Sequence, residues 1–117
     1  MGRTVVIVDD HAGFRDQVSR LLVEAGYDVI GSCPDGRSAL FLISRLQPDV
    51  VVLDVQLPDI DGFALMGQLE IDGPTVVLVS TREAADYGAR VGNSRAAGFI
   101  TKAELSARSM AAVVGPE

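Results

Sequence analysis

The sequence has almost no cysteine and no long apolar run. It contains one cysteine, Cys33, so no internal disulfide can form, and the apolar segment around it predicts a small core residue rather than a redox centre. No apolar run is longer than a strand, which argues against a bilayer-spanning helix, and residues 1–8 lack the long apolar stretch of a signal peptide. We therefore expect a cytoplasmic protein that does not bind membranes.

Positive charge is also scarce. Ten Lys and Arg residues stand against sixteen Asp and Glu, which gives a net charge of −6. A nucleic-acid surface needs clustered Lys and Arg to displace counterions, so this chain is not expected to bind nucleic acid directly. Nine of the ten basic residues are Arg, and Lys102 is the only Lys, so its position calls for an explanation of its own.

Strand-like and helix-like patterns alternate along the chain, whose 117 residues suit a single domain spanning 1–117. Strands are predicted at 4–8, 27–33, 50–53, 75–79 and 98–100. Helices are predicted at 12–25, between the cap Asp35 and Pro48, and at 63–69, 83–91 and 105–114. The helix at 83–91 is the weakest of the five, because Gly88 and Gly92 lower its helix propensity.

Five strand-helix units in this order predict an α/β fold. The strands are apolar enough to be buried on both faces, which is typical of a parallel sheet covered by helices on both sides. With right-handed crossovers, the usual solution is a flavodoxin-like, doubly wound, five-stranded parallel sheet with the strand order 2-1-3-4-5 and five helices. Ligands of such folds bind beyond the carboxyl ends of the strands.

Polar residues stand at the carboxyl ends of four of the predicted strands. They are Asp9 and Asp10, Asp54, Ser80 and Thr81, and Thr101 and Lys102. Two carboxylates about 5 Å apart repel by roughly 3 kcal/mol at an effective dielectric constant near 20, and a bound cation would remove most of this cost. Oxygen ligands without His or Cys in an open cleft suit Mg²⁺.

Each of these residues also has an ordinary explanation when it is taken alone. An Asp after a strand can cap the next helix or end the strand in a turn, Ser80 can cap a helix, and Lys102 can be a solvated charge. His11 is expected to be a polar residue at a helix start, and Asp59 a solvated loop charge. What favours a functional site is that the polar groups converge on one sheet edge and include the only lysine.

Four segments resemble the receiver domain of two-component response regulators, and the resemblance covers nearly the whole chain. They are "VDDH" at 8–11, "VVLDVQLPDIDG" at 51–62, "LVST" at 78–81 and "GFITK" at 98–102. The segments "VDDHAGFR" and "KAEL" are most similar to receivers that precede a LuxR-type helix-turn-helix output domain. The resemblance implies a role in phosphorelay signal transduction and transcription regulation.

By this resemblance, Asp54 accepts a phosphoryl group from the phosphohistidine of a sensor histidine kinase in a Mg²⁺-dependent reaction. Asp10 and Asp54 are expected to bind Mg²⁺ directly, Asp9 directly or through water, and Gln56 through its backbone carbonyl. Lys102 is expected to bind one phosphoryl oxygen.

Ser80 is expected to bind a second phosphoryl oxygen, and to do so only once the phosphoryl group is present. In the family, this shift lets an aromatic residue, here Phe99, rotate inward and remodel the face of helix four, strand five and helix five. A static core aromatic is the alternative for Phe99. Thr81, Arg82 and Gln56 flank the site at positions that tune the slow self-catalysed dephosphorylation in relatives.

Partners implied by the resemblance are the kinase and either an output domain or a phosphorylation-dependent homodimer. Two other functions stay open at this point: a phosphatase with an aspartate nucleophile, and a degenerate receiver that only contacts proteins. Such phosphatases carry a second Asp two residues after the nucleophile, where this chain has Gln56. One departure from the family is Ala103, which stands where many receivers have Pro.

Overall fold

The structure is a computed structural model, and it describes residues 2–115. Five parallel strands form one sheet in the order β2-β1-β3-β4-β5. The strands are β1 (Thr4–Val8), β2 (Asp28–Cys33), β3 (Val50–Asp54), β4 (Thr75–Ser80) and β5 (Gly98–Thr101). The predicted fold class and strand order are confirmed.

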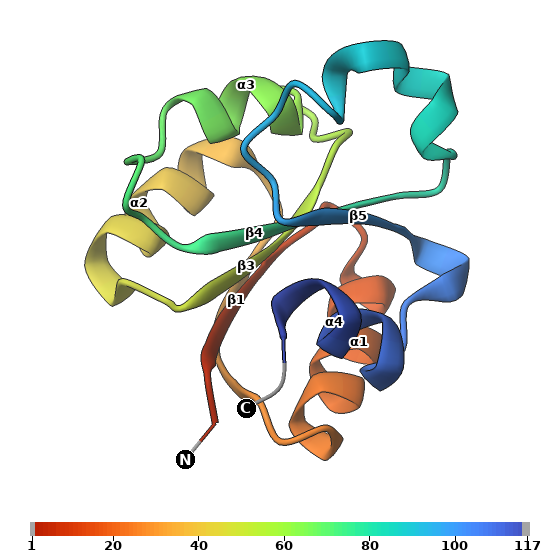
Figure 1. Cartoon of the computed structure of the whole chain (residues 1–117). Helices are drawn as coiled ribbons and strands as arrows, with labels where there is room; N and C mark the ends of the chain where they lie inside the picture. The colour runs from red at the N-terminus through yellow and green to blue at the C-terminus, as the bar shows by residue number, and fades with distance from the viewer. Residues whose placement is uncertain (1, 116–117) are drawn as a thin grey trace.

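Helical elements cover both faces of the sheet (Figure 1). One layer consists of α1 (Ala12–Glu24) and α4 (Ala107–Val114). The other layer consists of α2 (Gly36–Leu46), α3 (Gly62–Gly67) and the 3-10 segment η1 (Ala84–Arg90), and a short 3-10 turn, η2 (Lys102–Glu104), follows β5. Every residue of the central strand β3 is buried, because helices pack against both of its faces.

The core is divided by the sheet into two clusters. Val6, Val51 and Leu53 belong to the cluster under α2 and α3, whereas Val5, Val50 and Val52 belong to the cluster over α1 and α4. Neighbouring residues of one strand thus alternate between the two clusters, as the pleat of a strand requires. The two clusters therefore pack against opposite faces of the sheet.

Cys33 belongs to the first of these clusters, as the sequence predicted. Burial raises the pKa of its thiol to about 11, and the nearby Asp35 carboxylate acts in the same direction. Core packing rather than thiol chemistry therefore explains this residue.

Capping side chains fix where α2 and α3 begin. The carboxylates of Asp35 and Asp61 accept hydrogen bonds from the backbone N–H groups of Ser38 and Ala64, both at 2.8 Å. They therefore cap α2 and α3 respectively, as the sequence predicted for Asp35.

Asp59 also serves α2, although it lies in the loop after β3. Its carboxylate accepts hydrogen bonds from the N–H groups of Gly36 at 2.8 Å and Arg37 at 3.0 Å. These bonds hold the pKa of Asp59 below its ordinary value. Asp59 is exposed, as the sequence predicted, but it is a second cap for α2 rather than a free loop charge.

The element predicted as a helix at 83–91 is a 3-10 segment with a break. Gly88 has φ 59° and ψ −133°, a conformation that glycine adopts readily and other residues rarely adopt. Glu83 and Asp86 form a reciprocal capping box at the start of the segment, yet none of the residues in η1 is buried. The element that covers this part of the sheet is therefore only loosely packed.

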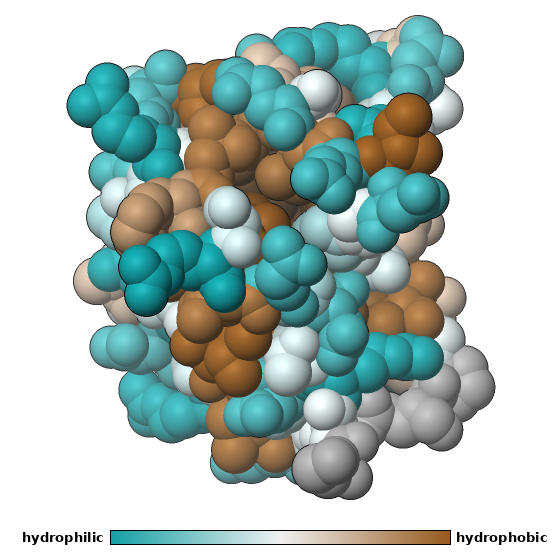
Figure 2. All heavy atoms as spheres, turned by 90° about the vertical axis from the view of Figure 1, so that its left-hand side faces the viewer, coloured by the Kyte–Doolittle hydropathy of each residue, from teal (hydrophilic) through white to brown (hydrophobic). Residues whose placement is uncertain are grey.

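The face near the amino ends of β3 and β4 carries hydrophilic and hydrophobic residues side by side, with a hollow between them (Figure 2). The hollow is lined in part by Leu40, Ile43, Leu69 and Pro74, and it lies at the opposite end of the sheet from Asp9 and Asp54. Within residues 2–115, no helix is long and apolar enough to cross a bilayer.

Candidate functional site

Four strands deliver polar side chains to one edge of the sheet. Asp9 follows β1, Asp54 ends β3, Ser80 ends β4 and Lys102 follows β5. These four strands are neighbours in the sheet, so their carboxyl ends lie side by side. Asp9 and Ser80 have no exposed surface, and Asp54 is 3% exposed, which means that these polar groups face one another rather than solvent.

The single lysine lies between the two buried carboxylates. Its Nζ is 2.6 Å from Asp9 Oδ2 and 3.3 Å from Asp54 Oδ2. The ammonium also lies 4.5 Å from the centroid of the Phe14 ring on α1, within the range of a cation–π contact. Lys102 is thus held in place from both sides, with only 11% of its side chain exposed.

Asp9 is fixed by contacts with the start of α1. Its Oδ1 accepts a hydrogen bond from the His11 N–H at 2.9 Å, and its backbone carbonyl accepts one from the Arg15 guanidinium at 2.6 Å. His11 is the N-cap residue of α1, as expected of a polar residue at a helix start, but its side chain makes no capping hydrogen bond. The local bonds of Asp9 therefore leave Oδ2 directed at Lys102.

Burial and charge raise the pKa of Asp54 to about 6. Burial is the largest cause, and the neighbouring Asp9 carboxylate adds to it; the Gln56 N–H, 3.1 Å from Asp54 Oδ1, and Lys102 act against it. Burial alone would lower the pKa of Lys102, but Asp9 and Asp54 outweigh burial and raise it. The lysine therefore stays charged, while the site still holds more carboxylates than cations.

The carboxylates fit a divalent cation. Asp9, Asp10, His11 and Asp54 can each offer one ligand atom, and these atoms lie within 4.8 Å of one another. Asp9 Oδ2 is buried, and its contact in the described part of the chain is the ion pair with Lys102. A carboxylate oxygen with spare capacity beside two further carboxylates is the ligand set that Mg²⁺ prefers.

His11 was not expected among these groups. Its Nδ1 lies 3.1 Å from Asp10 Oδ1 and 3.3 Å from Asp9 Oδ1. Asp10 and His11 are both exposed, so the outer side of the carboxylate cluster is open to solvent. A cation could reach Asp9 and Asp54 from that side.

Ser80 faces η1 in this structure. Its Oγ accepts a hydrogen bond from the Arg82 N–H at 3.0 Å and lies 2.7 Å from the Tyr87 hydroxyl. The next two residues, Thr81 and Arg82, are exposed. Sequence reasoning missed Tyr87, although it is the only aromatic residue in the segment 83–91.

Phe99 is half-buried and packs against Tyr87, with 5.9 Å between the ring centroids. Tyr87 in turn meets the edge of Phe63 on α3 at 5.6 Å. The three rings form a row above the sheet from β5 to α3. Phe99 therefore belongs to a partly exposed aromatic row rather than to the fully buried core.

Gln56 lies on the loop that leaves β3. It is exposed, and it forms an isolated bridge with Asp61, the cap of α3. Its N–H contacts Asp54, as described above, so the loop turns directly over the phosphoacceptor predicted from the sequence. The Lys102–Ala103 peptide bond is trans, as are the other peptide bonds of residues 2–115.

Comparison with known proteins identifies similar sequences and structures among response regulators. Residues 5–114 match the family described as the response regulator receiver domain. The chain is 37% identical over 106 residues to BvgA of Bordetella pertussis, a positive transcription regulator of virulence factors, and the match covers 89% of this chain and 51% of BvgA. It is 46% identical over 80 residues to protein-glutamate methylesterase/protein-glutamine glutaminase 6 of Anaeromyxobacter dehalogenans. This match covers 67% of this chain and 23% of the methylesterase.

Among solved structures, the chain is similar to the signal receiver domain of the response regulator NarL from Mycobacterium tuberculosis. The TM-score is 0.83, the identity is 30%, and 98% of each chain is covered. The chain spans about half the length of BvgA and about a quarter of the methylesterase, so its similarity to both is confined to one part of those proteins.

Proposed function

The chain belongs to the response regulator receiver domain family, and from this premise we propose that it carries a phosphoryl group on Asp54. A carboxylate oxygen of Asp54 attacks the phosphorus of a phosphohistidine on a sensor histidine kinase. The new P–O bond makes an acyl phosphate, the P–N bond breaks, and the imidazole leaves. The observation that carries this proposal is Asp54 itself, buried at a strand end beside Asp9 and Lys102.

The protonation state of Asp54 suits this reaction. With a pKa of about 6, the carboxyl group is mostly ionised at neutral pH and can act as a nucleophile. Burial removes part of its hydration, so little water has to leave before the carboxylate meets phosphorus. A divalent cation bound by Asp9, Asp10 and Asp54, with the Gln56 carbonyl as a further ligand, supplies positive charge for the phosphoryl oxygens.

Lys102 and Ser80 bind the phosphoryl group after transfer. The Lys102 ammonium, already 3.3 Å from Asp54 Oδ2, is within reach of an oxygen on a phosphoryl group attached there. Ser80 donates its hydroxyl to another phosphoryl oxygen once it leaves its present contacts. Both contacts are charge-assisted and thus stronger than neutral hydrogen bonds.

The movement of Ser80 would carry the signal outward. Phe99 then shifts in the aromatic row, and the surface formed by η1, β5 and α4 changes. The weak packing of η1, with no buried residue, supports a small free-energy difference between two arrangements of this surface. A sensor histidine kinase, and an output domain or a second copy of the chain, are the partners that this surface serves.

The proposed site also ends its own signal slowly. Water attacks phosphorus, the P–O bond to Asp54 breaks, and inorganic phosphate leaves while the Asp54 carboxylate is restored. Thr81 and Arg82 are exposed at the entrance, and Gln56 lies above Asp54, so these side chains control where water can enter. Their identity sets the lifetime of the phosphoryl group.

Acetyl phosphate tests the proposal without the kinase. Incubated with Mg²⁺ and acetyl phosphate, the protein should gain the mass of one phosphoryl group, as measured by intact-protein mass spectrometry. Asp54→Asn should gain none, and omission of Mg²⁺ should prevent the gain. Asp59→Asn is the matched control, because it makes the same chemical change in the loop after β3, outside the proposed site. This variant should still be modified.

Other outcomes separate the alternatives. Rapid release of phosphate with no accumulated adduct would favour a phosphatase. No reaction in any condition would favour a degenerate receiver that only contacts other proteins.

A further inference from the structure

We propose that Tyr87 is a positioning residue of the phosphorylation site, and that its hydroxyl holds Ser80 in the orientation of the unphosphorylated protein. This inference rests on the proposed function of Asp54 and Ser80. It adds a residue of η1 to the groups that determine how readily the phosphoryl group is bound. The structure carries it through one short contact, 2.7 Å between Ser80 Oγ and the Tyr87 hydroxyl oxygen.

The hydrogen-bonding capacity of Ser80 explains why this contact matters. A hydroxyl group can donate one hydrogen bond and accept two. The Arg82 N–H already occupies one acceptor position, and Tyr87 takes either the proton or the second acceptor position. Ser80 has no exposed surface, so water does not readily replace a partner that is lost. The two partners therefore fix the direction of Oγ.

Neither of these two partners belongs to the group of side chains around Asp54. Both partners of Ser80 Oγ belong to the segment that follows β4, and no hydrogen bond joins Ser80 to Asp54 in the described part of the chain. To donate to a phosphoryl oxygen, Oγ has to rotate away from η1 and give up the Tyr87 hydroxyl. The Tyr87 contact thus competes directly with phosphoryl binding.

The ring of Tyr87 couples this competition to η1. It lies between Phe63 and Phe99 in the aromatic row, at 5.6 and 5.9 Å between centroids. Because no residue of η1 is buried, this half-buried ring is a main anchor of η1 on the sheet. When Ser80 leaves, Tyr87 loses its polar contact with β4 but keeps its ring contacts with Phe63 and Phe99.

The variant Tyr87→Phe tests the competition, because it keeps the ring and removes only the hydroxyl. Beryllium trifluoride with Mg²⁺ serves as a stable probe of the phosphoryl group on Asp54. A hydrogen bond has a net value of about 1 kcal/mol, so its removal should tighten the binding of the probe about three- to tenfold. Binding is measured by titration with ¹⁹F NMR at a fixed Mg²⁺ concentration.

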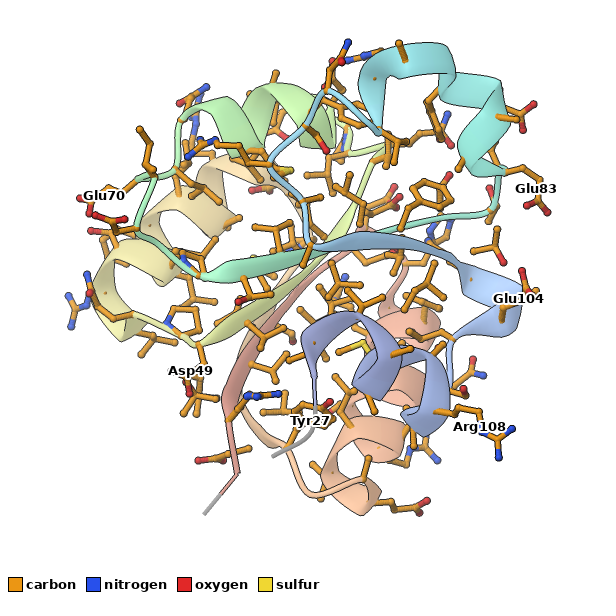
Figure 3. The ribbon with its side chains drawn as sticks, viewed as in Figure 1. Tyr27, Asp49, Glu70, Glu83, Glu104 and Arg108 are labelled. Carbon is orange, nitrogen blue, oxygen red and sulfur yellow. The ribbon has the colours of Figure 1, made fainter. Side chains whose placement is uncertain are left out.

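The chain offers a matched control in its other tyrosine. Tyr27 is buried in the cluster of α1 and α4, on the opposite side of the sheet from η1 (Figure 3). Tyr27→Phe makes the same chemical change there and should leave the affinity for the probe unchanged. In a Ser80→Ala background, Tyr87→Phe should no longer tighten binding, because the residue through which it acts is gone.

A measurement on the unmodified protein gives independent evidence. The ¹³Cζ chemical shift of Tyr87 should change when the probe binds, whereas that of Tyr27 should not. Unchanged or weaker binding by Tyr87→Phe, or tighter binding that persists in the Ser80→Ala background, would overturn the role of Tyr87. If instead the wild-type protein does not bind the probe, or Asp54→Asn binds it equally well, the proposed function itself fails.

Discussion

The two ends of strand β3 carry the same type of residue in opposite situations. At the amino end, Asp49 is exposed, and its Oδ2 accepts hydrogen bonds from the Thr4 N–H at 2.8 Å and the Thr4 hydroxyl at 3.1 Å (Figure 3). At the carboxyl end, Asp54 is buried beside Asp9, and both carboxylates share the one ammonium of Lys102. The amino end stabilises the fold, while the carboxyl end keeps unsatisfied negative charge for a ligand.

Of the changes at the two ends of β3, removing the shared cation should have the largest effect on the free energy of unfolding. In Lys102→Met, Asp9 and Asp54 are left buried without a cation, and breaking such a pair typically costs about 3 to 5 kcal/mol. We expect the free energy of unfolding, measured with urea in the presence of EDTA, to fall by this order. Added Mg²⁺ should recover part of the loss, because it binds the same carboxylates.

Arg108→Met is the control for this variant. It removes an exposed cation of α4 that points to solvent (Figure 3), and it should change the free energy of unfolding by less than about 0.5 kcal/mol. An equal loss in both variants would mean that Lys102 does not neutralise the buried carboxylates.

Removing the charge of Asp54 should have an intermediate effect of the opposite sign. The pKa of Asp54 is about 6 in the folded protein, above its ordinary value of 3.8, so the folded state binds the proton more tightly than the unfolded state. The stability due to this proton is present below pH 4 and is lost as the pH rises through 6. Asp54→Asn avoids that loss and should be more stable than wild type at pH 7 by about 1 to 2 kcal/mol.

Thermal and urea unfolding between pH 4 and 7, without Mg²⁺, measure this difference. The advantage of Asp54→Asn over wild type should grow as the pH rises through about 6. An advantage independent of pH would show that the charge of Asp54 is not its cause. With saturating Mg²⁺, wild type should regain stability and the variant should regain less.

The matched change at the amino end should have the smallest effect. Asp49→Asn keeps one acceptor oxygen but loses the charge that strengthens both bonds from Thr4, so stability should fall by less than about 1 kcal/mol. The sign is opposite to that of Asp54→Asn, and the same unfolding experiments measure it. If Asp49→Asn were more stable than wild type, the charge of Asp49 would not stabilise the amino end of β3.

The sequence predicted the parallel sheet and the residues at its carboxyl edge because both depend on local patterns. Buried strands are continuous apolar runs, and Asp54 and Lys102 stand directly at strand ends. What it could not predict are contacts that only the tertiary structure creates. Asp59 caps α2 from a position 23 residues away, and the hydroxyl of Tyr87 meets Ser80 only because η1 folds back over β4.

The segment 83–91 shows a further limit of local patterns. The apolar spacing of this segment is compatible with a helix, but Gly88 adopts a conformation that interrupts one. The helix propensity of glycine does not by itself predict whether the helix continues or breaks at this residue. The segment also carries Tyr87, whose ring packs against Phe63 and Phe99 from two other elements. Such packing is decided in three dimensions.

The bonds from Asp59 to the start of α2 have a consequence for protein engineering. A side chain on Gly36 would collide with Ile60, the residue after Asp59, so the bare backbone of Gly36 and the loop 56–61 are fitted to each other. Chimaeras that graft this loop from another protein should therefore transplant Gly36 with it. Gly36 and the loop 56–61, although distant in the sequence, therefore act as one structural unit.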